Sequence, residues 1–133
     1  LVPELTCAEN VALPLRLTGM GRKEAESRAA AWLERLEVDD VRHHRPGQVS
    51  GGQGQRVAVA RALVTEPRVV FADEPTGALD SYNGERVMQL LTDAARDTRA
   101  AVVLVTHEAR VAAYSDREIV VRDGRVRDMA GAA

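Results

Sequence analysis

Two short apolar runs, separated by a segment long enough for one helix, constrain the fold of this chain more than any other feature. Val69–Ala72 and Ala101–Thr106 are rich in β-branched residues, and such uninterrupted runs are typical of strands buried on both faces of a parallel sheet. The segment between them, from Tyr82 to about Asp97, has the apolar spacing of a helix. A strand–helix–strand unit of this kind predicts a right-handed parallel crossover and therefore an α/β fold.

The part of the chain before the first strand predicts helices instead. Thr6 and Glu9 have the spacing of a capping box at a helix start, and Pro14 predicts a kink or break in that helix. A second helix is predicted from Arg22, with Trp32 on its apolar face and therefore in the core. We expect a helical subdomain over residues 1–66 and an α/β part over residues 67–133 that ends in a loose tail.

A serine and two glycines precede the third predicted helix. Ser50 is a favourable N-cap, and Gly51 and Gly52 allow the backbone to come close to a ligand. The free N–H groups and the dipole of a helix start favour a phosphate there. The alternative is a tight connection that binds no ligand. Gln53 and Arg56 follow at fixed offsets, and they make this alternative less favoured.

Polar side chains follow both predicted strands. Asp73 and Glu74 end the first strand and His107 follows the second. The carboxyl ends of parallel strands share one rim, where ligands bind in open α/β sheets, and such a group suits phosphoryl transfer. Pro75 predicts an extended conformation for Glu74. The alternatives are surface charge or helix capping for the carboxylates and an ordinary surface position for the histidine.

Taken together, these motifs resemble the ATP-binding cassette (ABC) family, the ATP-hydrolysing subunits of ABC transporters. The resemblance covers residues 5 to 128. The sequence around Glu74 and near the N-terminus is most similar to that of the branch that exports lipoproteins and macrolides. The matching motifs are the signature loop Ser50-Gly51-Gly52-Gln53, the Walker B strand Val69–Glu74, the D-loop Gly77-Ala78-Leu79-Asp80 and the switch histidine His107.

The resemblance implies a role for each site residue. Asp73 would hold Mg²⁺ through water, Glu74 would polarise the attacking water, and His107 would contact the terminal phosphate of ATP. Ser50, Gly51, Gly52 and Gln53 would cover an ATP bound by a second cassette, packed head to tail with the first. Asp80 would reach across that interface, although it is also placed to cap the helix that starts near Ser81.

A Walker A motif is missing from the sequence. Such a loop needs a lysine after a glycine-rich turn, and the only lysine, Lys23, lies between Arg22 and Glu24. We expect this chain to be the C-terminal part of a P-loop NTPase-type cassette, unable to hydrolyse ATP alone. Core strands outside it would then leave apolar surface exposed on Val69–Phe71 and Val102–Val105.

Composition limits the partners. No apolar run approaches the roughly 18 residues of a membrane span, and a net charge of −2 with scattered arginines argues against nucleic acid. One cysteine, Cys7, fits a reducing cytoplasm. The resemblance implies a transmembrane permease subunit as partner and a location at the inner face of the cell membrane. The alternatives are a soluble ABC-type ATPase that acts on nucleic acid or ribosomes, and an inactive fragment.

Overall fold

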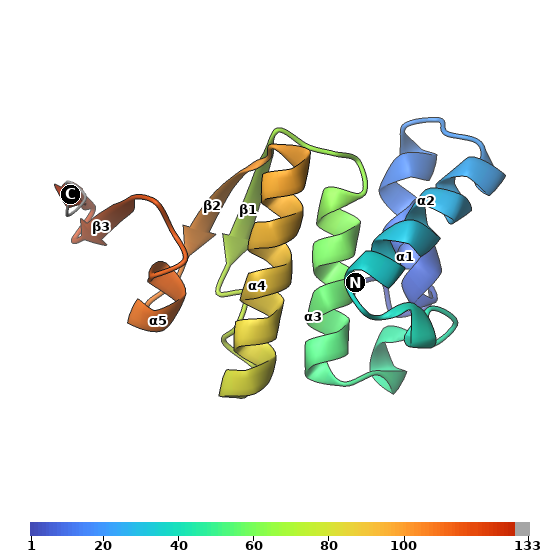
Figure 1. Cartoon of the computed structure of the whole chain (residues 1–133), viewed down its shortest axis with the longest axis horizontal. Coiled ribbons are helices and arrows are strands. Elements are labelled where there is room, and N and C mark those ends of the chain that lie inside the picture. The colour runs from blue at the N-terminus through green and yellow to red at the C-terminus, as the bar shows by residue number, and fades with distance from the viewer. Residues whose placement is uncertain (130–133) are drawn as a thin grey trace.

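The computed structural model describes residues 1–129. Figure 1 shows helices α1 and α2 at one end of the molecule, α3 and α4 with strands β1 and β2 in the middle, and α5 with a hairpin at the other end. The elements are α1 (Cys7–Leu17), α2 (Arg22–Arg35), the 3₁₀ turns η1 (Asp39–Val41) and η2 (Pro46–Gln48), α3 (Gly51–Leu63), β1 (Val69–Asp73), α4 (Ser81–Thr98), β2 (Ala101–Val105), α5 (Ala109–Ala112), β3 (Glu118–Arg122) and β4 (Arg125–Met129). Within the described residues, no helix combines the length and the hydropathy needed to cross a bilayer.

The start of α1 confirms the predicted capping box. The Thr6 hydroxyl accepts the Glu9 backbone N–H at 3.2 Å, and the Glu9 carboxylate accepts the Thr6 backbone N–H at 2.8 Å. Of the predicted kink or break at Pro14, the break is wrong, because α1 continues to Leu17; the kink stays a prediction. A proline in a helix interior costs about 3 kcal/mol, whereas burying Val11 and Leu15 on either side of it stabilises the helix by about 1.5–3 kcal/mol each.

Helix α2 presents the predicted apolar face to the core. Ala25, Ala29 and Leu33 are fully buried, and Trp32 is 8% exposed. The Arg35 guanidinium lies over the Trp32 ring, 4.9 Å from its centre, in a cation–π contact. Trp32 is therefore a core residue, as predicted.

Strands β1 and β2 pair in parallel, with Val69 opposite Ala101 and Asp73 opposite Val105. Helix α4 makes the crossover between them and lies against the strands (Figure 1). Val70 is buried on the face that α4 covers. This unit confirms the α/β prediction.

The other face of the strand pair is not covered, so the expected burial on both faces is wrong. Phe71 is 79% exposed, and the exposed apolar side chains on this face are Val69, Phe71, Val103 and Val105. Successive side chains in a strand point to opposite faces, and for this reason the predicted exposure of Val69–Phe71 and Val102–Val105 holds only for alternate residues.

One continuous core joins the helical part to the strands. Helix α3 lies between α1 and α4 (Figure 1), and the buried residues extend from Cys7 in α1 through Leu63 in α3 to Val111 in α5. The division into residues 1–66 and 67–133 stays a prediction. Packing around α3 fixes the orientation of the helices that carry the site.

The C-terminal strands form a hairpin. β3 and β4 are antiparallel, with Arg122 opposite Arg125. Asp123 and Gly124 between them have φ of 51° and 70°, the left-handed pair that a tight two-residue hairpin turn requires. Of the expected loose tail, Met129 is the last residue of β4, and residues 130–133 lie outside the described residues.

Candidate functional site

Glu74 lies at the carboxyl end of β1 with an unusual backbone conformation. Its N–H donates to the Val105 carbonyl at 2.8 Å, which continues the strand pairing by one bond. Its φ is 44°, so the extended conformation predicted from Pro75 is wrong. Left-handed backbone at a residue other than glycine costs on the order of 1–3 kcal/mol and is concentrated at functional sites.

His107 holds the Glu74 carboxylate in this conformation. Glu74 Oε1 accepts the His107 backbone N–H at 3.2 Å and lies 2.7 Å from His107 Nδ1, while Oε2 accepts the Thr106 hydroxyl at 3.4 Å. The His107 side chain is 82% exposed and that of Glu74 is 36% exposed. The structure therefore brings these two predicted residues together at the solvent-facing rim of the strand pair.

The contact shifts both ionisation equilibria. The hydrogen bond to Glu74, followed by its negative charge, raises the pKa of His107 above its ordinary 6.5. The hydrogen bond to His107 lowers the pKa of Glu74 below its ordinary 4.5. The two shifts widen the pH range between the carboxyl pKa and the imidazole pKa, in which both groups are charged.

The sign of the pH dependence follows from these shifts. The stability that His107 contributes is fully present below 6.5 and is lost as pH rises through its raised pKa. The stability that Glu74 contributes is present above 4.5 and is lost as pH falls through its lowered pKa. The ion pair therefore weakens at both ends of the pH scale.

Replacing Glu74 with glutamine is expected to return the pKa of His107 toward 6.5, because the main cause of its rise is removed. The imidazole signals of His107 in an NMR titration of the chain measure this change. Glu4→Gln, an exposed change at the N-terminus, is the control and should leave the pKa of His107 unchanged. An equal response to both substitutions would show that Glu74 is not the cause.

The turn of residues 50–53, the signature turn, caps α3 with a reciprocal pair of hydrogen bonds. Ser50 Oγ accepts the Gln53 N–H at 3.2 Å, and Gln53 Oε1 accepts the Ser50 N–H at 3.0 Å. The N-cap role of Ser50 is confirmed. The partner role of Gln53 was missed in the sequence, although its three-residue spacing from Ser50 is the capping-box signal.

Asp80 caps α4 in a similar way. Its Oδ1 accepts the Asn83 N–H at 3.0 Å and its Oδ2 accepts the Asn83 side-chain amide at 2.6 Å. These bonds, with the backbone bond first, lower the pKa of Asp80. Helices α3 and α4 begin on the lower side of the molecule in Figure 1, and strands β1 and β2 run toward the same side. Both helix N-termini and both strand carboxyl ends therefore face this side.

The signature turn packs closely on the start of α4. A Cβ atom on Gly52 would lie 2.7 Å from Asn83 Oδ1 and 3.3 Å from Asn83 Cβ, and one on Gly51 would lie 3.5 Å from Leu79 Cδ2. Gly52 is buried. Glycine at this position therefore allows the two helix starts to touch.

We expect Gly52→Ala to lower the free energy of unfolding by about 1–3 kcal/mol, the usual cost of forcing extra volume into a packed contact. Asn83 would have to turn away and lose its 2.6 Å bond to Asp80. Urea denaturation measures the loss, and adding Asn83→Ala should recover part of it. Gly54→Ala is the matched control, because its new Cβ would meet only Val49 at 3.8 Å. Equal effects at the two glycines would contradict the packing argument.

Asp73 is exposed at the last position of β1, opposite Val105. A carboxylate at a strand end fits Mg²⁺, which is commonly held by one or two carboxylates, water and phosphate oxygens. Among residues 1–129 there is no group of three or more histidine, cysteine, aspartate or glutamate side chains suited to a metal. A site based on Asp73 would therefore need oxygen ligands from a bound phosphate and water.

Three further polar residues border this rim and were not singled out in the sequence. Thr76 Oγ1 donates to Glu108 Oε1 at 3.3 Å, and Arg110 donates to Glu108 Oε2 at 2.7 Å. Within residues 1–129, no hydrogen bond joins the signature turn to Glu74 or His107. The structure therefore forms two groups on one side of the fold, the Glu74–His107 pair and the two capped helix starts.

A large cleft lies on the helical part, away from these groups. Its volume is about 720 Å³, and it opens between α1, α2 and the segment around η1. Acidic and basic side chains both line the cleft. The lining residues are Leu5, Thr6, Ala8, Glu9, Ala12, Leu13, Arg16, Arg22, Glu26, Ala30, Arg42 and His43.

Comparison with known proteins identifies close relatives of the chain. The family model described as ABC transporter matches residues 1–77. A lipoprotein-releasing system ATP-binding protein LolD from Koribacter versatilis is 47% identical over 129 residues, which is 97% of this chain and 58% of that protein. A macrolide export ATP-binding/permease protein MacB from Chromobacterium violaceum is 48% identical over 99% of this chain and 20% of that protein.

Solved structures agree with the sequence relatives. The ATP-binding cassette MJ0796, in a dimeric post-hydrolysis state bound to ADP and Pi, matches with a TM-score of 0.83 and 43% identity. The match covers 98% of this chain and 60% of that chain. The chain thus spans about three-fifths of the cassettes it resembles, and 58% of the LolD relative.

Proposed function

Because this chain belongs to the ABC transporter ATP-binding family, we propose that it supplies the signature turn and the hydrolytic carboxylate of an ATPase that powers export or release of a substrate through separate transmembrane permease subunits. The observation that carries the proposal is the Glu74–His107 pair at the ends of two parallel strands. The capped starts of α3 and α4 face the same side (Figure 1).

Glu74 would act on the attacking water. An ionised carboxylate accepts a hydrogen bond from water and orients its oxygen toward the phosphorus, and the lowered pKa of Glu74 keeps it ionised at neutral pH. His107 uses Nδ1 for Glu74, which leaves Nε2 free to donate to an oxygen of the terminal phosphate. The raised pKa of His107 favours the cation that neutralises the developing charge.

Asp73 would hold Mg²⁺, with water and phosphate oxygens as the remaining ligands. When bound, this ion supplies positive charge to the phosphates. The position of Asp73 next to Glu74 in the chain and at the end of β1 supports this role.

The signature turn would act on a second cassette. Ser50 and Gln53 hold the start of α3 in a fixed shape, and the helix N-terminus offers N–H groups and partial positive charge to a phosphate. Gly51 and Gly52 carry no side chain to obstruct it. We therefore infer a head-to-tail dimer in which these four residues cover the partner's ATP and Asp80 reaches across the interface.

The membrane partner would dock on the helical part. The cleft between α1 and α2 has about 720 Å³ of space and both charged and apolar lining, which suits a helical segment of a permease. Docking there would hold the protein at the inner face of the membrane. No observation on the structure favours nucleic acid or the ribosome as the partner.

The decisive experiment uses a complete cassette that carries this sequence, expressed with and without its permease. We expect Mg²⁺-dependent ATP hydrolysis and co-purification of an integral membrane protein. Absence of both would refute the proposal. The isolated chain, which has no Walker A loop, should bind ATP weakly or not at all, and tight Mg²⁺-dependent binding in a calorimetric titration would contradict this part.

A further inference from the structure

Glu108 follows His107 directly and is tied to a different part of the chain. Its side chain is 21% exposed. Oε1 accepts the hydroxyl of Thr76 at 3.3 Å, and Oε2 accepts Arg110 Nε at 2.7 Å. Thr76 is only 3% exposed. The carboxylate therefore joins the loop after β2 to the loop after β1.

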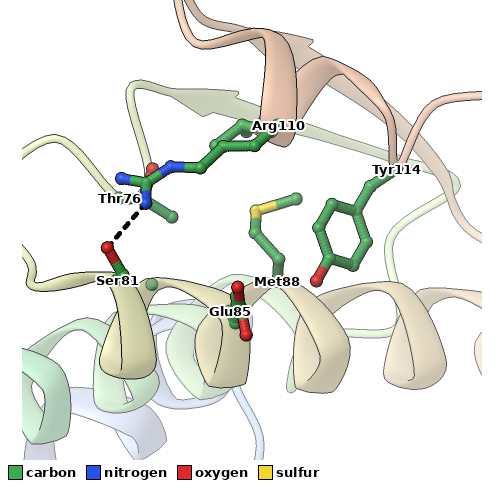
Figure 2. A pocket seen from close by; sticks show the side chains of 8 residues that line it. Thr76, Ser81, Glu85, Met88, Arg110 and Tyr114 are labelled. Atoms are coloured by element: carbon green, nitrogen blue, oxygen red, sulfur yellow. Dashed lines mark hydrogen bonds between the residues drawn. The ribbon is translucent and has the colours of Figure 1, made fainter.

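Arg110 extends this connection to the start of α4. Figure 2 shows its guanidinium reaching across a pocket to Ser81, and Arg110 Nη1 donates to Ser81 Oγ at 2.8 Å. Ser81 follows Asp80 and is the first residue of α4. The segment 76–81, which includes Asp80, is thus held to the His107 loop at both of its ends.

The space beneath Arg110 is hollow. The pocket between α4 and α5 has a volume of about 120 Å³, with Met88, Val111 and Tyr114 among its lining residues. Side-chain packing between α4 and α5 is therefore incomplete near the rim. Near this pocket, the hydrogen bonds of Arg110 and Glu108 link the two elements in addition to the buried Met88 and Val111.

The same loop also carries the Glu74 contact. The Thr106 hydroxyl accepts the Glu108 N–H at 3.1 Å and donates to Glu74 Oε2 at 3.4 Å. A displacement of Glu108 would therefore move Thr106 and His107, the two residues that hold the Glu74 carboxylate.

We propose that Glu108 is a positioning residue that couples the segment 76–81 to His107. This assignment rests on the function proposed above. A partner or nucleotide that shifts Asp80 also shifts His107, and a ligand that shifts His107 also shifts Asp80, because coupling between two sites is reciprocal. Glu108 touches neither the water nor the phosphate, and acts through Thr76, Arg110 and His107.

The first test measures the coupling without hydrolysis. In the chain itself, Ser81→Ala and Thr76→Val remove one bond each, and we expect both to change the backbone amide and imidazole NMR signals of His107. Thr98→Val is the matched control, because the Thr98 hydroxyl bonds only to carbonyls within α4. His107 signals that respond no more to Ser81→Ala and Thr76→Val than to the control would overturn the proposal.

The second test uses a complete cassette. Glu108→Gln leaves an amide N–H facing either Thr76 or Arg110, and we expect kcat for ATP to fall about tenfold or more, since small misplacements of reacting groups are costly, with KM changed less than about twofold. Arg110→Lys, which keeps a cation, should retain more activity than Arg110→Ala. A kcat unaffected by Glu108→Gln, or a loss confined to KM, would overturn the proposal. An unsubstituted cassette that fails to hydrolyse ATP would refute the proposed function, and the NMR result would then decide the coupling alone.

Discussion

Glu74→Gln in a complete cassette is expected to lower the rate of ATP hydrolysis by about 10²–10⁴-fold, the usual contribution of a positioned general base. The glutamine side chain has nearly the same shape but cannot polarise water as a carboxylate does. It also loses the charge that pairs with His107. Steady-state hydrolysis measures the loss. Nucleotide affinity, measured separately, should change little, because in the proposed function Glu74 acts on the attacking water and not on the base or ribose.

A second glutamate provides the control for this experiment. Glu34 is exposed on α2, and Glu34→Gln makes the same chemical change away from the strand ends, so hydrolysis should stay within about twofold. If Glu74→Gln also stayed within about twofold, Glu74 would not be the group that activates water. Another residue would then have to carry that role.

The meeting of Glu74 and His107 could be predicted from the sequence because parallel strands impose it. Two apolar runs joined by one helix must end at the same rim, and each polar residue directly follows one run. The 2.7 Å contact between the two side chains is a consequence of that topology. The caps at Ser50 and Asp80 were predictable for a similar reason, since both depend on residues within three positions.

Other features depend on contacts that have no local signal. Thr76 and Glu108 are 32 positions apart, and neither stands in a pattern that predicts a partner. The left-handed backbone of Glu74 opposes the local preference before proline, and it occurs together with bonds from Glu74 to Val105 and His107. In α1, burial of Val11 and Leu15 outweighed the local effect of Pro14. In each case tertiary contacts decided against the local rule.

The uncovered face of the strand pair shows a further limit of sequence patterns. A continuous apolar run indicates that both faces of a strand avoid water, but it does not say which residues cover them. Val70 is covered by the helices, whereas the neighbouring Phe71 is 79% exposed. The pattern correctly identified the strand, and the partner of its second face could not be read from it.

Replacing Leu63 with alanine is expected to lower the free energy of unfolding by about 2–5 kcal/mol, the range for a buried leucine that leaves a cavity. Leu63 is fully buried in α3, and α3 lies between α1 and α4 (Figure 1). A cavity there removes packing contacts from the continuous core to which Leu63 belongs. Urea denaturation of the 133-residue chain, followed by circular dichroism, measures the change.

Leu17 is the matched control for this substitution. It ends α1 and is 78% exposed, so Leu17→Ala removes the same atoms without opening a cavity and should change stability by no more than about 0.5 kcal/mol. Similar losses at the two positions would mean that α3 is not packed between the helical part and the strands. Because the signature turn lies against the start of α4 at Gly52 and Asn83, that result would also weaken the structural basis for placing them on one face.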